Sequence, residues 1–135
     1  MPETPTVDYF KTVDGETFAG LHLLVEIWDG ENLTDPNKID QILRGAASAA
    51  GATILHSHMH HFSPLGGVSG VVLLAESHIS IHTWPERNYA AVDIFMCGDC
   101  DPNLSLPVLK KGFSAPKLTV QEIRRGIVSR VDLTL

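Results

Sequence analysis

The sequence predicts an α+β fold, a two-layer sandwich in which two helices cover a mainly antiparallel sheet. Short segments of alternating apolar and polar residues recur along the chain, and this two-residue period is typical of strands with one buried face. Only two segments place apolar residues at helical spacing, one early and one late. With 135 residues, of which 44% are hydrophobic, the chain has the size and composition of one domain with its own core.

The N-terminal segment has the least regular pattern. Residues 1–19 contain Pro2, Pro5 and Gly15 and show no sustained period, so we expect an irregular arm there. We expect the remaining residues, 20–135, to form a single domain.

The domain begins with a strand and a helix. Apolar and polar residues alternate from residue 22 to residue 28, which predicts a strand. Asp35 is a suitable helix cap, and Pro36 suits the first helical turn. Before Gly51 ends the helix, its apolar residues share one face: Ile39, Ile42, Leu43, Ala46 and Ala50.

The rest of the chain is predicted to form further strands and a second helix. The predicted strands are residues 53–60, 68–75, 78–82, 89–96 and 118–123. A helix is predicted over residues 105–113, with Ser105 as its cap. The order is strand, helix, several strands, helix, strand, which favours the α+β class.

Composition excludes several classes of function. The net charge of −6 comes from scattered acids, and the basic residues form no stripe, so we expect no nucleic-acid partner. The sequence contains no apolar run of about 20 residues and no leader-like start, so we expect a cytoplasmic protein without a membrane partner. Cys97 and Cys100 lie too close together to staple a domain and are expected to be reduced thiols.

Residues with catalytic chemistry are concentrated between positions 76 and 100. From residue types alone, Ser77 with His82 is a possible nucleophile and base. Cys97 with His82 is a possible thiol and activating partner. A polar strand face that ends in a buried cysteine explains the same pattern, so the residues alone leave these alternatives open.

A metal site is a further alternative. Cys97 and Cys100 have the spacing of a redox dithiol or of half a zinc site. His56, His58 and His60 alternate along a predicted strand and share a face, which suits metal ligation. Solvent-facing histidines on a half-buried strand give the same pattern, so we expect no resident metal.

A longer pattern is more specific than any of these. The segments that carry it are residues 75–86 (AESHISIHTWPE), 89–93, 97–99, 62–64, 67–70 and, more faintly, 20–22 with Glu26. This pattern resembles the small prokaryotic S-adenosylmethionine decarboxylases, which are made as proenzymes. The chain differs from the forms with which it is compared in having Leu21 where arginine is common, a loop one residue longer at residues 65–67, and an additional N-terminal segment.

The resemblance implies that the chain cuts itself. Cleavage is expected between Glu76 and Ser77, to give a beta chain of residues 1–76 and an alpha chain of residues 77–135 that begins with a pyruvoyl group made from Ser77. This covalent pyruvate is the expected cofactor, and its ketone forms a Schiff base with the substrate amine. Ser69 and His82 match residues assigned to processing, Cys97 matches the proton donor, and an unusual backbone geometry at the 76–77 bond would assist cleavage.

The resemblance also implies a substrate and an assembly. Phe62 matches a ring that stacks on adenine and Glu86 a carboxylate that accepts from the ribose hydroxyls, so the expected substrate is S-adenosylmethionine, decarboxylated for spermidine and polyamine biosynthesis. A homodimer whose sites draw on both protomers is implied. Two alternatives stay open: a pyruvoyl-dependent decarboxylase of ornithine or arginine, and a non-catalytic domain that binds metal through histidines and cysteines.

Overall fold

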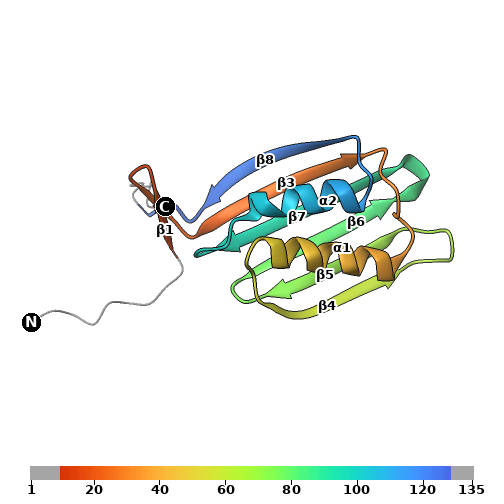
Figure 1. The fold of residues 1–135 in the computed structure, drawn as a ribbon, viewed down its shortest axis with the longest axis horizontal. Helices are drawn as coiled ribbons and strands as arrows, with labels where there is room; N and C mark the ends of the chain where they lie inside the picture. The colour runs from red at the N-terminus through yellow and green to blue at the C-terminus, as the bar shows by residue number, and fades with distance from the viewer. Residues whose placement is uncertain (1–9, 129–135) are drawn as a thin grey trace, which may run out of the picture.

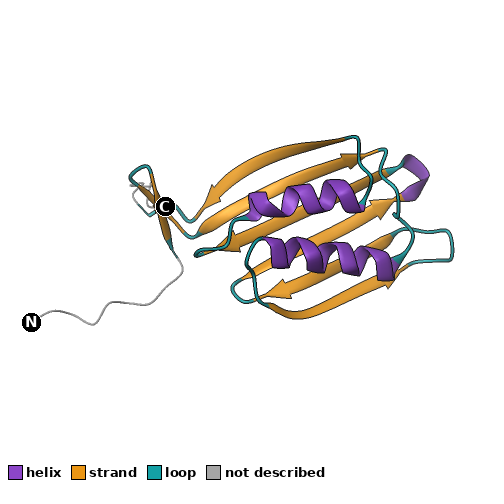
Figure 2. Ribbon diagram, in the orientation of Figure 1, coloured by secondary structure: helices purple, strands orange, loops and turns teal. Residues whose placement is uncertain are grey.

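The computed structural model describes residues 10–128. They form a six-stranded sheet with two helices on one face and a small two-stranded hairpin at one end (Figures 1 and 2). The strands are β1 (Lys11–Val13), β2 (Glu16–Phe18), β3 (Gly20–Trp28), β4 (Ile54–His61), β5 (Val68–Leu74), β6 (Ser77–Trp84), β7 (Tyr89–Cys97) and β8 (Lys117–Arg125). The helices are α1 (Pro36–Ala49) and α2 (Leu106–Gly112), and two short 3₁₀ helices are η1 (Pro85–Arg87) and η2 (Pro102–Ser105).

The large sheet has the strand order β4-β5-β6-β7-β3-β8, and each pair of neighbours is antiparallel. The predicted α+β class and two-layer arrangement are therefore confirmed. The strands predicted for this sheet are all present, and their ends differ from the predicted ones by no more than two residues because periodicity marks the middle of a strand better than its ends.

Helix α1 forms as its sequence predicts. The Asp35 side chain accepts hydrogen bonds from the backbone N–H groups of Asn37 and Lys38, at 3.0 and 3.2 Å. These bonds satisfy two of the N–H groups that a helix start leaves without partners. The apolar face of α1 packs on the sheet, where Ile39 and Leu43 are fully buried.

Helix α2 begins where the sequence predicts, with Ser105 at its N-cap position. The Ser105 side chain makes no capping hydrogen bond, and Ser105 is also the last residue of η2. Its buried hydroxyl instead donates to the Ala46 carbonyl oxygen at 2.7 Å. Ser105 therefore ties the second helical segment to α1, a tertiary contact that a capping rule does not anticipate.

The expected irregular arm is wrong for residues 11–18, which form the β1-β2 hairpin. Its turn places Asp14 and Gly15 at φ values of 52° and 81°, the left-handed geometry that an Asp-Gly pair favours in two-residue hairpins. Phe18 is fully buried and lies 4.8 Å from the Arg124 guanidinium. The rest of the predicted arm, residues 1–9, lies outside the described residues.

The two faces of the sheet have different environments. The face under the helices carries the core, with Leu23, Ile79, Ile81 and Ile94 fully buried. The opposite face is covered by no element among residues 10–128, as Figure 2 shows. It carries His22, His78, His82 and Asp93 among other side chains, because residues on one face of a strand alternate with those on the other.

In this part of the chain, neither helix has the length and apolar composition required to cross a membrane.

Candidate active site

The turn between β5 and β6 contains a backbone strained at the predicted cleavage site. Glu76 is the second of the two residues that join these strands, and its φ is 62°. A residue with a Cβ atom adopts this left-handed conformation at an energetic cost, and such residues concentrate at functional sites. The unusual geometry expected next to the 76–77 bond is therefore present on the Glu76 side of it.

The register of β6 and β7 brings Cys97 to this turn. His78 pairs with Phe95 in this antiparallel register. Counting two residues back from His78 and two residues forward from Phe95 places Glu76 opposite Cys97. The Cys97 thiol donates to the Glu76 carbonyl oxygen at 3.0 Å. That carbonyl belongs to the bond expected to break.

Ser77 lies beside the same thiol. It is 7% exposed, and its hydroxyl oxygen accepts a hydrogen bond from the Cys97 backbone N–H at 3.4 Å. The Ser77 hydroxyl and the Cys97 sulfur are 3.9 Å apart. The structure thus brings together three predicted site residues, Glu76, Ser77 and Cys97, which we call the cleavage cluster.

Ser69 and His82 form a second pair. They are register partners on β5 and β6, and the Ser69 hydroxyl and His82 Nδ1 are 2.8 Å apart. His82 is five residues beyond Ser77 on the same strand, about 16 Å away at 3.3 Å per residue. Because five is an odd number, the two side chains also point to opposite faces of the sheet.

Within one chain, therefore, His82 reaches neither Ser77 nor Cys97. The two pairings suggested by residue types, Ser77 with His82 and Cys97 with His82, are not formed in the described structure. The predicted site is split into the cleavage cluster at one end of β6 and the Ser69–His82 pair toward the other.

Phe62 and Glu86 lie in the loops at the end of the sheet that is nearest His82, which we call the His82 end. Phe62 follows β4, is 64% exposed, and donates its backbone N–H to the Gly67 carbonyl oxygen at 3.1 Å. Glu86 is exposed on η1, directly after the end of β6. The two loops are tied together because the Val68 N–H donates to the Thr83 hydroxyl at 2.8 Å.

An aromatic group at the same end of the sheet was not anticipated from the sequence. Tyr89 stacks on Trp28 and on Trp84, with ring centroids 4.4 and 5.3 Å away. The Tyr89 hydroxyl donates to the Glu26 carboxylate at 2.8 Å. Burial, together with this carboxylate, raises the pKa of Tyr89 to about 12. The strand register pairs Tyr89 with both tryptophans, so a correct alignment of strands would have found the group.

The histidine and cysteine ligand set proposed as an alternative is not assembled. His56, His58 and His60 lie on β4, at the edge of the sheet, whereas Cys97 ends β7. Two strands separate β4 from β7, a spacing of about 14 Å at 4.8 Å per strand. Among the described residues, a different group has ligand-like spacing, namely His22, His78 and Asp93.

Two cavities reach the cleavage cluster. One of about 750 Å³ is lined by Phe10, Lys11, Glu76, Cys97, Cys100 and their neighbours, so the N-terminal hairpin forms part of its wall. Burial raises the pKa of the Cys100 thiol at this wall. The second cavity, of about 450 Å³, is lined by His22, Glu76, Ser77, His78, Phe95 and Arg125.

Residues 21–126 match the family model described as S-adenosylmethionine decarboxylase. The chain belongs to the S-adenosylmethionine decarboxylase family. Seven residues were assigned to the site from the resemblance, and all lie inside the matched segment: Phe62, Ser69, Glu76, Ser77, His82, Glu86 and Cys97. The β1-β2 hairpin lies outside it.

Individual proteins named as S-adenosylmethionine decarboxylases support the family membership. The S-adenosylmethionine decarboxylase proenzyme of Thermomicrobium roseum is 39% identical over 110 residues, which cover 81% of this chain and 95% of that protein. The proenzyme of Pelotomaculum thermopropionicum is 47% identical over 117 residues, covering 84% and 92%. The crystal structure of the adenosylmethionine decarboxylase from Aquifex aeolicus has a TM-score of 0.74 at 34% identity and covers 87% of this chain and 98% of that one.

Proposed function

We propose that this chain is a proenzyme that cuts itself between Glu76 and Ser77 and then decarboxylates S-adenosylmethionine. The observation that carries the proposal is the geometry of the cleavage cluster. A strained Glu76, with φ of 62°, presents its carbonyl oxygen to the Cys97 thiol and lies directly before the buried Ser77 hydroxyl. The relatives named as decarboxylase proenzymes support the same conclusion.

Cleavage converts the Glu76–Ser77 amide into an ester and then breaks the ester. The Ser77 hydroxyl oxygen attacks the Glu76 carbonyl carbon, the hydroxyl proton passes to the amide nitrogen, and that nitrogen leaves the carbon as a free amine. A base then removes the Cα proton of Ser77, the bond between the Ser77 Cβ and the ester oxygen breaks, and Glu76 departs as a carboxylate that keeps this oxygen. Water replaces the nitrogen on the dehydroalanine that remains, which releases ammonia and leaves a pyruvoyl group at the start of residues 77–135.

Cys97 has a place in both stages. During cleavage its thiol hydrogen bonds to the Glu76 carbonyl oxygen, where negative charge develops when Ser77 attacks. The pyruvoyl ketone supplies an electron sink for the loss of carbon dioxide from the substrate amino acid. Cys97 lies beside Ser77, whose Cα becomes the ketone carbon, so its thiol is the group we expect to return a proton to the carbon that lost the carboxylate.

The split site favours a homodimer. Ser69 and His82, assigned to processing, lie about 16 Å from Ser77 in the same chain by strand geometry. The face of the sheet that bears His82 is uncovered and includes the exposed rings of Trp28 and Trp84. A two-fold pairing of these faces would bring the His82 end of one protomer to the cleavage cluster of its partner.

The substrate proposal rests on the His82 end. An exposed Phe62 ring offers a surface for adenine, and the exposed Glu86 carboxylate accepts hydrogen bonds from ribose hydroxyls. The product would supply aminopropyl groups for polyamine synthesis in the cytoplasm. No observation favours ornithine or arginine, or a metal-binding domain without catalysis.

The proposal is tested with intact mass and carbon dioxide release. The purified 14.7 kDa chain is expected to yield two fragments, with the second beginning at a pyruvoyl group. Carboxyl-labelled S-adenosylmethionine should release labelled carbon dioxide, whereas labelled ornithine and arginine should not. A chain that stays uncut, or that acts only on a basic amino acid, contradicts the proposal.

A further inference from the structure

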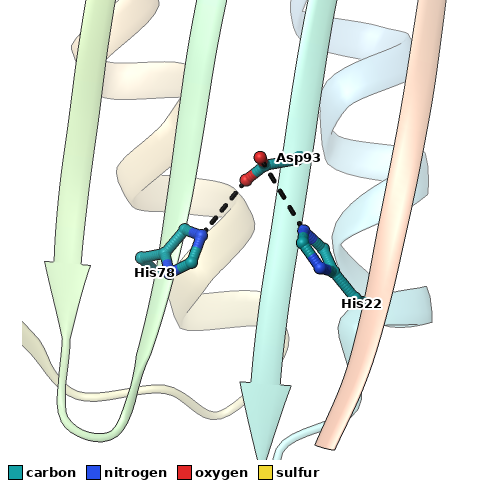
Figure 3. A group of neighbouring side chains, drawn as sticks. All are labelled: His22, His78 and Asp93. Atoms are coloured by element: carbon teal, nitrogen blue, oxygen red, sulfur yellow. Dashed lines mark ion pairs between the residues drawn. The ribbon is translucent and has the colours of Figure 1, made fainter. Parts of the chain in front are cut away.

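Three polar side chains meet on the uncovered face of the sheet, directly beside the proposed cleavage site. His78 Nε2 lies 3.2 Å from one Asp93 carboxylate oxygen, and His22 Nε2 lies 3.7 Å from the other (Figure 3). The three residues come from three adjacent strands, β6, β7 and β3. We call them the His22–Asp93–His78 array.

The array continues onto a fourth strand. The Arg125 guanidinium on β8 lies 3.0 Å from His22 Nδ1. A guanidinium can only donate, so Nδ1 accepts, and in the neutral ring the proton is on Nε2, facing Asp93. The Phe95 ring packs beside both imidazoles, with ring centroids 5.7 Å from His22 and 6.0 Å from His78, and the two imidazole centroids are 6.1 Å apart.

This tautomer decides between two uses of the array. The three donor atoms lie within 4.8 Å of one another, which is compatible with a metal ion. A metal needs a free lone pair on His22 Nε2, but the Arg125 contact leaves that nitrogen with its proton. The contacts therefore favour an imidazole–carboxylate–imidazole array over a metal site.

The position of the array relative to the cut gives it a role. His78 is the residue whose backbone nitrogen would carry the pyruvoyl group, so it becomes the second residue of a new chain. Before cleavage the covalent bond to Glu76 holds this end of β6, and after cleavage that restraint is lost. The His78–Asp93 contact is then the first side-chain restraint on the new terminus.

The array also joins the two products. His22 belongs to residues 1–76, whereas His78, Asp93 and Arg125 belong to residues 77–135. His22 Nε2 and Asp93 Oδ1 are buried and make no hydrogen bond of good geometry, which is a cost that an apolar face would avoid. A polar array kept at this cost beside Ser77 is better explained by function than by packing.

We propose that the His22–Asp93–His78 array positions the pyruvoyl group by fixing the end of β6 once the chain is cut, an inference that rests on the proposed function. Asp93 and His22 are positioning residues, because they act through His78. Loss of the array leaves cleavage intact and lowers turnover, since the precursor does not need it.

The test is Asp93→Asn, with Asp40→Asn as a matched control on α1, where Asp40 pairs with Arg44. Mass spectrometry should show complete cleavage in both, and phenylhydrazine should label one ketone in each second chain. The kcat for S-adenosylmethionine should fall about 10- to 100-fold in Asp93→Asn, with KM changed far less, and stay unchanged in the control. Asp93→Glu should recover part of the rate, and a metal chelator should change nothing.

A second measurement isolates positioning from folding and from catalysis. Hydrogen exchange at residues 78–82 should accelerate in cut Asp93→Asn relative to the cut parent, but not when the same change is made in an uncut Ser77→Ala background. Equal exchange in the cut proteins overturns the inference, as does equal acceleration in the uncut background. If the parent is cut but inactive on S-adenosylmethionine, the exchange result still shows whether the array fixes the end of β6. A parent that is never cut overturns both proposals.

Discussion

The Cys97 thiol lies 3.0 Å from the Glu76 carbonyl oxygen, so the residue expected to protonate the product also contacts the bond expected to break. The thiol is the donor, and the oxygen is where charge would develop when Ser77 attacks. The resemblance assigns Cys97 to protonation alone, whereas this contact indicates a role in cleavage as well. It leads to the first prediction.

Replacing Cys97 should affect cleavage and turnover to different extents. Cys97→Ala removes one hydrogen bond to the Glu76 oxygen, which should slow cleavage about fivefold. Turnover of the cut enzyme should fall about 100-fold or more, because the proton donor is lost. Cys97→Ser retains a donor and should cleave faster than Cys97→Ala. Timed gels and carbon dioxide release measure the two rates, and identical cleavage in both variants would remove Cys97 from the first stage.

The conformation of Glu76 stores strain that glycine should release. In the uncut Ser77→Ala background, Glu76→Gly should raise the free energy of unfolding by about 1 kcal/mol, since glycine adopts a φ of 62° without the Cβ penalty. Denaturant unfolding measures the change. Ala75→Gly is the control, because Ala75 has no positive φ, and it should not stabilise the protein. A destabilised Glu76→Gly chain would show that the turn holds no such strain.

The division of the site can be tested by mixing two inactive variants. Ser77→Ala keeps His82, and His82→Ala keeps Ser77, and each should remain uncut alone. When equal amounts are unfolded and refolded together, about half of the His82→Ala chains should enter mixed dimers and be cut. Mass spectrometry distinguishes the chains. A mixture that stays uncut means that His82 does not act between protomers.

Tyr89 should make the protein lose stability at high pH. Its pKa is raised to about 12, so between pH 10 and pH 12 the unfolded chain loses the phenolic proton while the folded chain keeps it. The stabilisation is complete below pH 10 and declines as the pH rises toward 12. Thermal unfolding of Tyr89→Phe should therefore show a smaller drop in Tm between pH 8 and pH 11 than the parent shows. Equal drops would assign the loss to other groups.

Alternation and capping signals predicted the elements of the sheet and helix α1, because these depend on local sequence. The Asp35 cap is one such local feature. The Ser105 contact with Ala46 was missed because it joins residues 59 positions apart. The β1-β2 hairpin was missed because each strand has three residues, too few to show a period, although Asp14-Gly15 was a readable turn signal.

The site was predicted residue by residue but not in its arrangement. A motif gives the identity of Ser77 and His82, and strand alternation already implies that residues five apart face opposite ways. The separation of Ser69 and His82 from the cleavage cluster follows from that alternation. The His22–Asp93–His78 array required the strand order β6-β7-β3, which local patterns do not specify.

The distance between His82 and Ser77 on one strand has a kinetic consequence. If each cut requires a second copy, activation is a second-order process whose half-time shortens as the protein accumulates. Newly made chains at low abundance would persist as intact precursor, and the first pairs to meet would become active. The spacing of two residues on β6 would then let the amount of protein set the moment at which the enzyme begins to work.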